Sequence, residues 1–161
     1  MIQRIQTLYL LAIVALGIAL LFLPVLQLVT PEEASELRIY NLGANGLELV
    51  TNEDCQPVIC LQGLWGLLVT TALIPLLALV DIFLYKNRIL QARLNIFLAL
   101  LCIGYYGVLA IYIWQAKLAL GVDWHILPYA SFPLVCFVLT LMATRRILKD
   151  EALVRAADRI R

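Results

Sequence analysis

The stretch LQGLWGLLVTTALIPLLALVDIFLY, residues 61–85, decides the fold class of this chain. It carries a single charged residue, Asp81, and its apolar side chains cover every face of a helix. A helix in a soluble protein is apolar along one stripe, whereas a helix that is apolar all round is typical of a membrane span. About 20 such residues cross the ~30 Å hydrocarbon core of a bilayer. Residues 61–85 are therefore predicted to form a transmembrane helix.

Three further stretches of the 161-residue chain have the same character, at residues 8–29, 94–114 and 126–144. The chain is 63% hydrophobic and 14% charged, whereas a soluble domain is about 25% charged. We interpret the first stretch as a retained anchor, because it is longer than the 7–15 apolar residues of a signal peptide. The sequence therefore predicts an all-α membrane protein, with residues 1–161 forming one domain built on a four-helix transmembrane bundle.

The distribution of lysine and arginine predicts the orientation of these spans, because cytoplasmic segments are enriched in both residues. Ten of the 12 basic residues precede the first span, separate the second from the third, or follow the fourth. Only Arg38 and Lys117 lie on the other side. Both termini are thus expected in the cytoplasm, with the loop of residues 30–60 outside the inner membrane of a bacterium.

The outer loop contains the sequence LRIYNLGANGLELV, residues 37–50, which alternates in part between apolar and polar side chains. Its Asn45-Gly46 pair is a strong signal for a short hairpin turn, because both residues tolerate a positive φ. An isolated hairpin is marginally stable in water and needs further support. We therefore expect a small β-hairpin in this first extracytoplasmic loop, packed on the helices and closed by a disulfide between Cys55 and Cys60.

The alternative for Cys55 and Cys60 is a thiol–disulfide site that passes electrons to a quinone. Relays of that kind need a second extracytoplasmic cysteine pair, and residues 115–126 contain no cysteine. The spacing of the pair also differs from the C-x-x-C that favours a reactive thiolate. Cys102 and Cys136 lie in the middle of spans, where a free cysteine usually acts as a small buried hydrophobe. We therefore favour a structural disulfide between Cys55 and Cys60.

Two other residues are candidates for chemistry. Asp81 is the only acid inside a span, and intramembrane carboxylates are often functional, although an ion pair with Lys86 or Arg88 is the simpler interpretation. The single histidine, His125, has only Asp123 beside it as a second ligand, fewer than the three or four of a zinc site. No metal, no cofactor and no enzymatic motif is therefore expected, and no basic or aromatic stripe suggests nucleic acid.

Proline and glycine mark further positions in the spans. Pro75 removes a backbone donor and is expected to kink the second span. Gly104 and Gly107 lie in the third span, where small residues allow helices to approach closely. We expect these glycines to pack within the bundle, with contact to a partner as the alternative.

The last segment, residues 145–161, predicts a charged helix that continues the fourth span into the cytoplasm. It is either an anchor at the headgroup surface or a docking element for a partner, and the sequence favours neither. The basic residues that would contact such a partner are Arg145, Arg146, Lys149, Arg155 and Arg159.

The opening MIQRIQTLYLL and the closing KDEALVRAADRIR, with four spans between them, resemble a family of small integral membrane proteins of Bacteroidetes-type bacteria whose domain has no assigned function. The resemblance implies an inner-membrane location and a four-helix bundle, and it implies no activity. We expect a non-enzymatic structural or accessory subunit of an envelope assembly, in contact with lipid and with a membrane-protein partner or a second copy. The alternatives are a small-molecule or lipid transporter or binding protein that uses Pro75 and Asp81, and a quinone-linked thiol redox protein.

Overall fold

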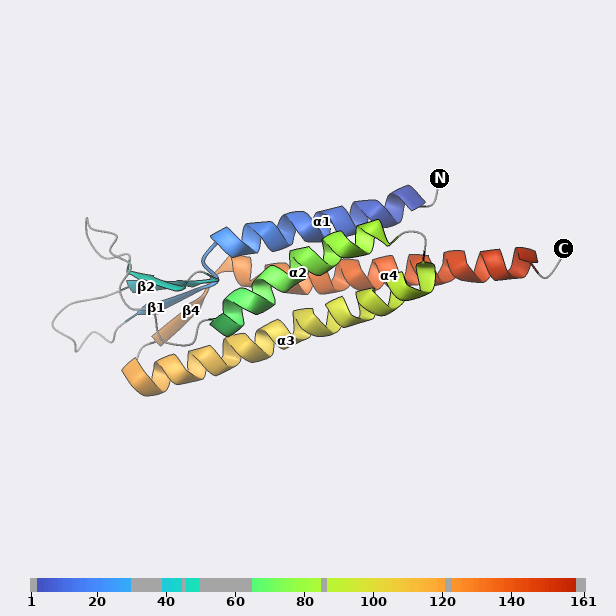
Figure 1. Ribbon diagram of the computed structural model, residues 1–161. Helices are drawn as coiled ribbons and strands as arrows, with labels where there is room; N and C mark the ends of the chain where they lie inside the picture. The colour runs from blue at the N-terminus through green and yellow to red at the C-terminus, as the bar shows by residue number, and fades with distance from the viewer. Residues whose placement is uncertain are drawn as a thin grey trace.

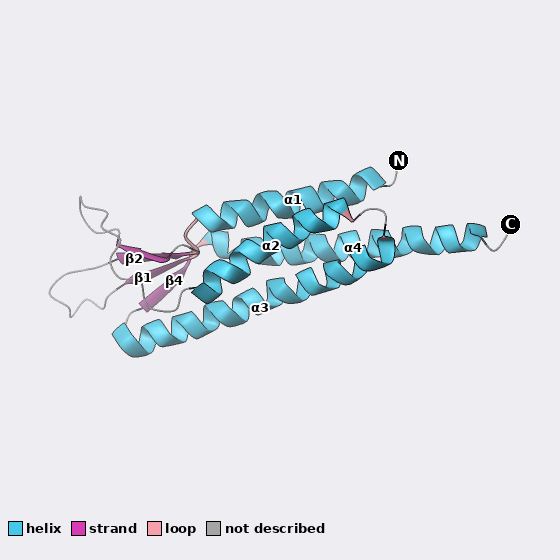
Figure 2. Ribbon diagram, viewed as in Figure 1, coloured by secondary structure: helices cyan, strands magenta, loops and turns pink. Residues whose placement is uncertain are grey.

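Four long helices lie side by side in the computed structural model, which describes residues 3–29, 39–44, 46–49, 65–84, 87–120 and 123–158 (Figure 1). Successive helices run in opposite directions, and a small sheet lies at one end of the bundle (Figure 2). Each helix contacts two neighbours, so that the four form a closed ring. The helices are α1 (Gln3–Phe22), α2 (Trp65–Phe83), α3 (Arg88–Leu120) and α4 (Phe132–Asp158).

The bundle interior is built from apolar stripes at helical spacing. In α1 the buried positions Leu10, Ile13, Gly17 and Leu20 follow one another at intervals of three or four residues. Two clusters of buried side chains result, one near the sheet and one nearer the opposite end. The outer surfaces of the helices are also apolar, with Leu100 as one example among many exposed large hydrophobic side chains. Soluble monomers rarely expose apolar surface on this scale.

Three of the described helices are long and apolar enough to cross a membrane: Trp65–Phe83, Ile89–Leu118 and Pro128–Asp150. A shorter apolar helix covers Gln6–Phe22. The expectation of a mostly helical protein with four helices is confirmed.

The sheet contains four antiparallel strands in the order β3-β2-β1-β4. The strands are β1 (Leu26–Val29), β2 (Ile39–Gly43), β3 (Gly46–Leu49) and β4 (Asp123–Ile126). The expected hairpin is confirmed as β2 and β3, which pair across a tight turn with Gly43 opposite Gly46. Gly46 has φ 137°, a backbone conformation that favours glycine.

The sheet extends beyond the hairpin because two of the predicted spans contain strand residues at one end. The first predicted span ends in β1, and the fourth begins with the last residue of β4. Both helices are therefore shorter at that end than expected. The first helix ends at Phe22 and not at residue 29, because Pro24 cannot donate a helical hydrogen bond. Leu26–Val29 then alternates between buried and half-buried side chains as the central strand β1.

At the fourth span, Ile126 belongs to β4, which pairs with β1. A 3-10 turn, Pro128–Ser131, follows before α4 begins at Phe132.

The two other predicted spans also form helices. The second span corresponds to α2, which continues through Pro75 without interruption. The third span of residues 94–114 is part of the longer α3, with 33 residues. The expected helix after the fourth apolar stretch is present as the continuation of α4, which extends past the other helices and is described to Asp158 (Figure 1).

Candidate functional site

Asp81 lies at the end of α2 and faces the bundle interior, where it is 1% exposed. Gln91 and Asn95 lie one turn apart on α3 and are also buried. The short connection between the two helices places them together, and the side-chain amide of Gln91 donates to the backbone carbonyl oxygen of Asp81 at 3.3 Å. These three polar residues form a cluster, here called the inner polar cluster, at the end of the bundle opposite the sheet.

The inner polar cluster contains side-chain atoms without hydrogen-bond partners. Both carboxylate oxygens of Asp81 and both amide atoms of Asn95 are buried, and they have no hydrogen-bond partner among the residues that the structure describes. Asn95 lies close to the Asp81 carboxyl, outside hydrogen-bonding geometry. An isolated charge buried in a protein costs several kcal/mol. The arrangement therefore suits a carboxyl that holds a proton.

The ion pair expected between Asp81 and Lys86 or Arg88 stays a prediction, because both basic side chains lie outside the described residues. Sequence reasoning singled out Asp81 but missed Gln91. The signal was present, because Gln91 and Asn95 are four residues apart and so share one face of a helix.

A second buried polar group lies nearer the sheet. Tyr105 on α3 is fully buried, and its hydroxyl has no hydrogen-bond partner among the described residues. Thr71 on α2 donates its hydroxyl to the backbone carbonyl of Leu67 at 2.6 Å, within its own helix. Cys102 and Cys136 are buried free thiols, as expected from their positions in the middle of spans.

The end opposite the sheet is also joined by a polar contact between α1 and α4. Gln6 donates a side-chain hydrogen bond to the carboxylate of Asp150. Of the predicted partner-docking residues, Arg145, Arg146 and Lys149 are exposed on α4. The side chains of Arg155 and Arg159 lie outside the described residues.

At the sheet end, His125 and Asp123 are exposed on the edge strand β4. No group of three metal-ligating side chains occurs among the residues with described positions. Cys55 and Cys60 lie outside those residues, so their predicted disulfide stays a prediction.

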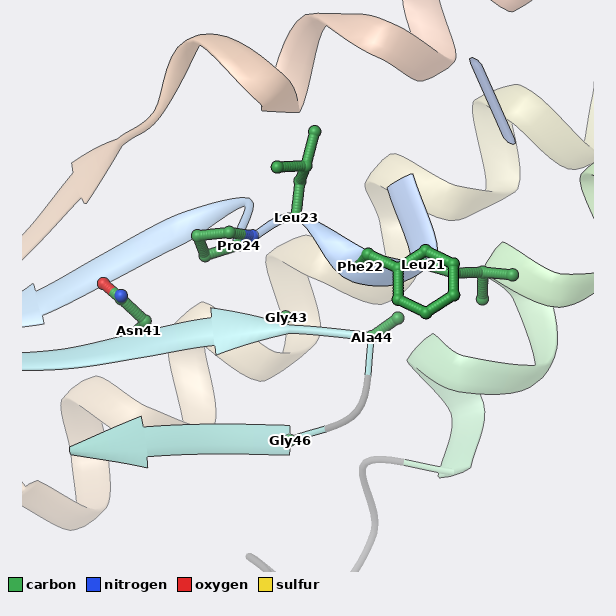
Figure 3. A pocket seen from close by; sticks show the side chains of 8 residues that line it. All are labelled: Leu21, Phe22, Leu23, Pro24, Asn41, Gly43, Ala44 and Gly46. Atoms are coloured by element: carbon green, nitrogen blue, oxygen red, sulfur yellow. The ribbon is translucent and has the colours of Figure 1, made fainter. Parts of the chain in front are cut away.

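The sheet end also contains two cavities that sequence reasoning missed. A small pocket of about 30 Å³ lies where α1 turns into β1, and Figure 3 shows Pro24, Asn41 and Ala44 around it. The larger cavity is an open groove of about 590 Å³. It is lined by ten residues of β1, α3, β4, the 3-10 turn and α4: Leu26, Tyr106, Leu109, Ile113, Ile126, Leu127, Pro128, Ala130, Ser131 and Leu134. We refer to it as the outer groove.

Comparison with known proteins identifies a family without assigning an activity. No curated protein matches the chain significantly. The family described as "Domain of unknown function (DUF4293)" matches residues 2–160, which is nearly the whole chain. A domain-of-unknown-function family was expected from the two ends of the sequence. The chain belongs to the DUF4293 family.

Proposed function

We propose that this protein crosses the inner membrane of a bacterium four times, with both termini in the cytoplasm and the sheet outside. Three helices have the length and composition of spans. The fourth, α1, has 20 residues, which at 1.5 Å per residue measure about 30 Å, the thickness of the hydrocarbon core. Because α1 packs between α2 and α4, it occupies the same layer as two helices that qualify as spans.

The charged side chains support this orientation. Arg93 near the start of α3 and Arg145, Arg146 and Lys149 in α4 are exposed at the end opposite the sheet. Lys117 is the exposed basic residue of α3 near its sheet end. Because basic residues are enriched on the cytoplasmic side of a membrane, the end with four exposed basic residues is placed inside and the sheet outside.

The role that this arrangement supports best is that of a structural or accessory subunit in an envelope assembly, without an activity of its own. The observation that carries the proposal is the presence of two protein surfaces beyond the apolar bundle, one at each end. Outside, β4 is an edge strand with all four residues exposed, and exposed edges pair readily with other strands. Inside, α4 extends past the other helices with exposed basic side chains (Figure 1).

Purification from native membranes in a mild detergent tests this role. An accessory subunit co-elutes with a partner at a fixed ratio, and replacing Arg145, Arg146 and Lys149 together with glutamine lowers the recovery of a cytoplasmic partner. Arg93→Gln is the matched control, because it removes an exposed basic charge from the same end of the bundle but from another helix. A homo-oligomer without a partner, in both the wild type and the variant, contradicts the proposal.

Proton-coupled transport is a second candidate, and the inner polar cluster favours it. Asp81 and Asn95 place a carboxyl and an amide inside the bundle, both without a hydrogen-bond partner in the described part of the chain. Replacing Asp81 with asparagine abolishes a proton-coupled activity but leaves the assembly of an accessory subunit intact. Proton uptake into proteoliposomes, compared between the wild type and Asp81→Asn, separates the two functions.

A further inference from the structure

The outer groove lies at the sheet end of the bundle, between α3 on one side and β4 with the start of α4 on the other. Leu26 and Leu109 are buried lining residues, whereas Ile126 and Leu134 are largely exposed. Ser131 is the one hydroxyl residue of the lining besides Tyr106, and its side chain already donates to the backbone carbonyl of Pro128 at 2.7 Å. The groove thus offers an apolar surface, and its volume of about 590 Å³ is within the range of small-molecule sites.

Hydrogen bonds hold the walls of the outer groove in place. The Tyr106 hydroxyl donates to the carbonyl oxygen of Ala130 at 2.7 Å and accepts from the backbone N–H of Leu134 at 3.1 Å. The backbone N–H of Leu127 donates to the carbonyl oxygen of Val25, which extends the pairing between β1 and β4. Because hydrogen bonds between separate elements fix both walls, the groove is a defined part of the fold.

A positive charge lies near one end of the groove. Leu109 and Ile113 line it from α3, and Lys117 follows one turn later on the same face of the helix, exposed. The open side of the groove continues into the apolar outer surface of the helices, where Leu134 is 56% exposed. Trp114 and Trp124 are exposed at the same end, and tryptophan favours the headgroup level of a bilayer.

From this combination we propose that the outer groove binds one phospholipid of the outer leaflet. An acyl chain lies in the apolar groove, and the headgroup phosphate pairs with the Lys117 ammonium. The proposal rests on the membrane placement argued above, because only that placement puts the groove at the level of lipid headgroups. It adds a binding site that neither the accessory role nor transport requires.

Photo-crosslinking tests the proposal directly. The full-length protein is reconstituted in nanodiscs of phosphatidylethanolamine with a phosphatidylglycerol that carries a diazirine on one acyl chain, and the labelled peptides are identified by mass spectrometry. Label is expected to concentrate on the groove residues Leu109 and Ile113 over the exposed α3 residues Leu100 and Ile103. Even labelling of all exposed apolar side chains overturns the proposal, because it describes ordinary contact with the bilayer.

Two variants sharpen this experiment. Leu134→Trp fills the groove and is expected to lower groove labelling about tenfold, the effect of excluding roughly two methylene groups of the chain. Leu141→Trp is the matched control, since Leu141 is exposed on the same face of α4 two turns away and does not line the groove. Ile126→Trp serves as a second filling variant if Leu134→Trp does not fold. Undiminished labelling in a folded filling variant contradicts the site.

Replacing the lysine separates headgroup recognition from chain binding. With Lys117→Gln, the labelling of the groove by the phosphatidylglycerol probe is expected to fall to that of an uncharged diacylglycerol probe carrying the same diazirine. Arg93→Gln, at the opposite end of α3, is expected to change neither probe. Equal labelling by both probes in the wild type contradicts phosphate recognition. A protein in the reverse orientation is detected independently by protease protection of its tail, so failure of the membrane placement is distinguishable from failure of the site.

Discussion

The contact between Gly17 of α1 and Pro75 of α2 allows a sharp test of how the bundle packs. A Cβ atom built on Gly17 would lie 2.9 Å from Cδ and 3.0 Å from Cβ of the Pro75 ring. Carbon atoms in van der Waals contact are about 3.5–4.0 Å apart. The proline ring is bonded to the backbone nitrogen of α2, so it cannot rotate away as a flexible side chain would. Gly17→Ala is therefore expected to push α1 and α2 apart.

The size of the effect follows from two opposing contributions. Overpacking a close-packed interior costs about 1–3 kcal/mol. Replacing a helical glycine with alanine gains about 0.5–1 kcal/mol, independently of the packing. Gly104 on α3 isolates the second contribution, because a Cβ atom there meets nothing within 4 Å. The free energy of unfolding of Gly17→Ala is therefore expected to be lower than that of Gly104→Ala by about 1–3 kcal/mol.

Equilibrium unfolding in mixed detergent micelles, followed by the circular dichroism of the helices, measures this difference. The double variant Gly17→Ala, Pro75→Ala adds a second check, because alanine lacks the Cδ and Cγ atoms of the ring, at 2.9 and 3.2 Å from the new methyl group, and keeps only Cβ. The cost of Gly17→Ala is expected to fall in that background, a coupling that residues in contact show. Equal stability of Gly17→Ala and Gly104→Ala would refute the close packing of α1 on α2.

Three other predictions address the polar groups and the outer loop. Tyr106→Phe is expected to lower the free energy of unfolding by about 1–3 kcal/mol, measured in the same way, because it leaves two backbone groups unpaired. Asp81→Leu is expected to raise it by about 1–3 kcal/mol, since an apolar side chain of similar size replaces a buried carboxyl that has no hydrogen-bond partner among the described residues. A lower stability would indicate a partner for Asp81. Cys55 and Cys60 are expected to react with a thiol label only after reduction, and labelling of unreduced membranes would disprove the disulfide.

The helices and the hairpin could be predicted from the sequence because their signals are local. An apolar run such as residues 65–83 forms a helix in a wide range of surroundings. The Asn45-Gly46 pair predicts a turn without information from distant parts of the chain. The continuation of α4 through its charged segment is similarly local, because no glycine or proline interrupts it between Pro133 and Asp158.

The strands β1 and β4 could not be predicted in the same way, because each depends on the other. Leu26–Val29 and Asp123–Ile126 adjoin apolar helical segments and pair with each other across about 100 residues of sequence. The break at Pro24 is visible in the sequence, but proline is tolerated in membrane helices when neighbouring groups satisfy the backbone. Only the pairing of β1 with strands on both sides shows that the chain leaves the helix there.

The glycines of α3 show why a residue type alone does not identify its environment. Gly104 and Gly107 were expected to bring helices together, yet a Cβ atom at either position meets nothing within 4 Å. Close packing instead occurs at Gly17, whose position in the buried stripe of α1 places it against a rigid proline ring. Helix periodicity predicts which residues share a face, but the orientation of that face depends on all four helices together. The same reasoning applies to Asp81. Its depth in the span was visible in the sequence, whereas its contact with α3 required the bundle.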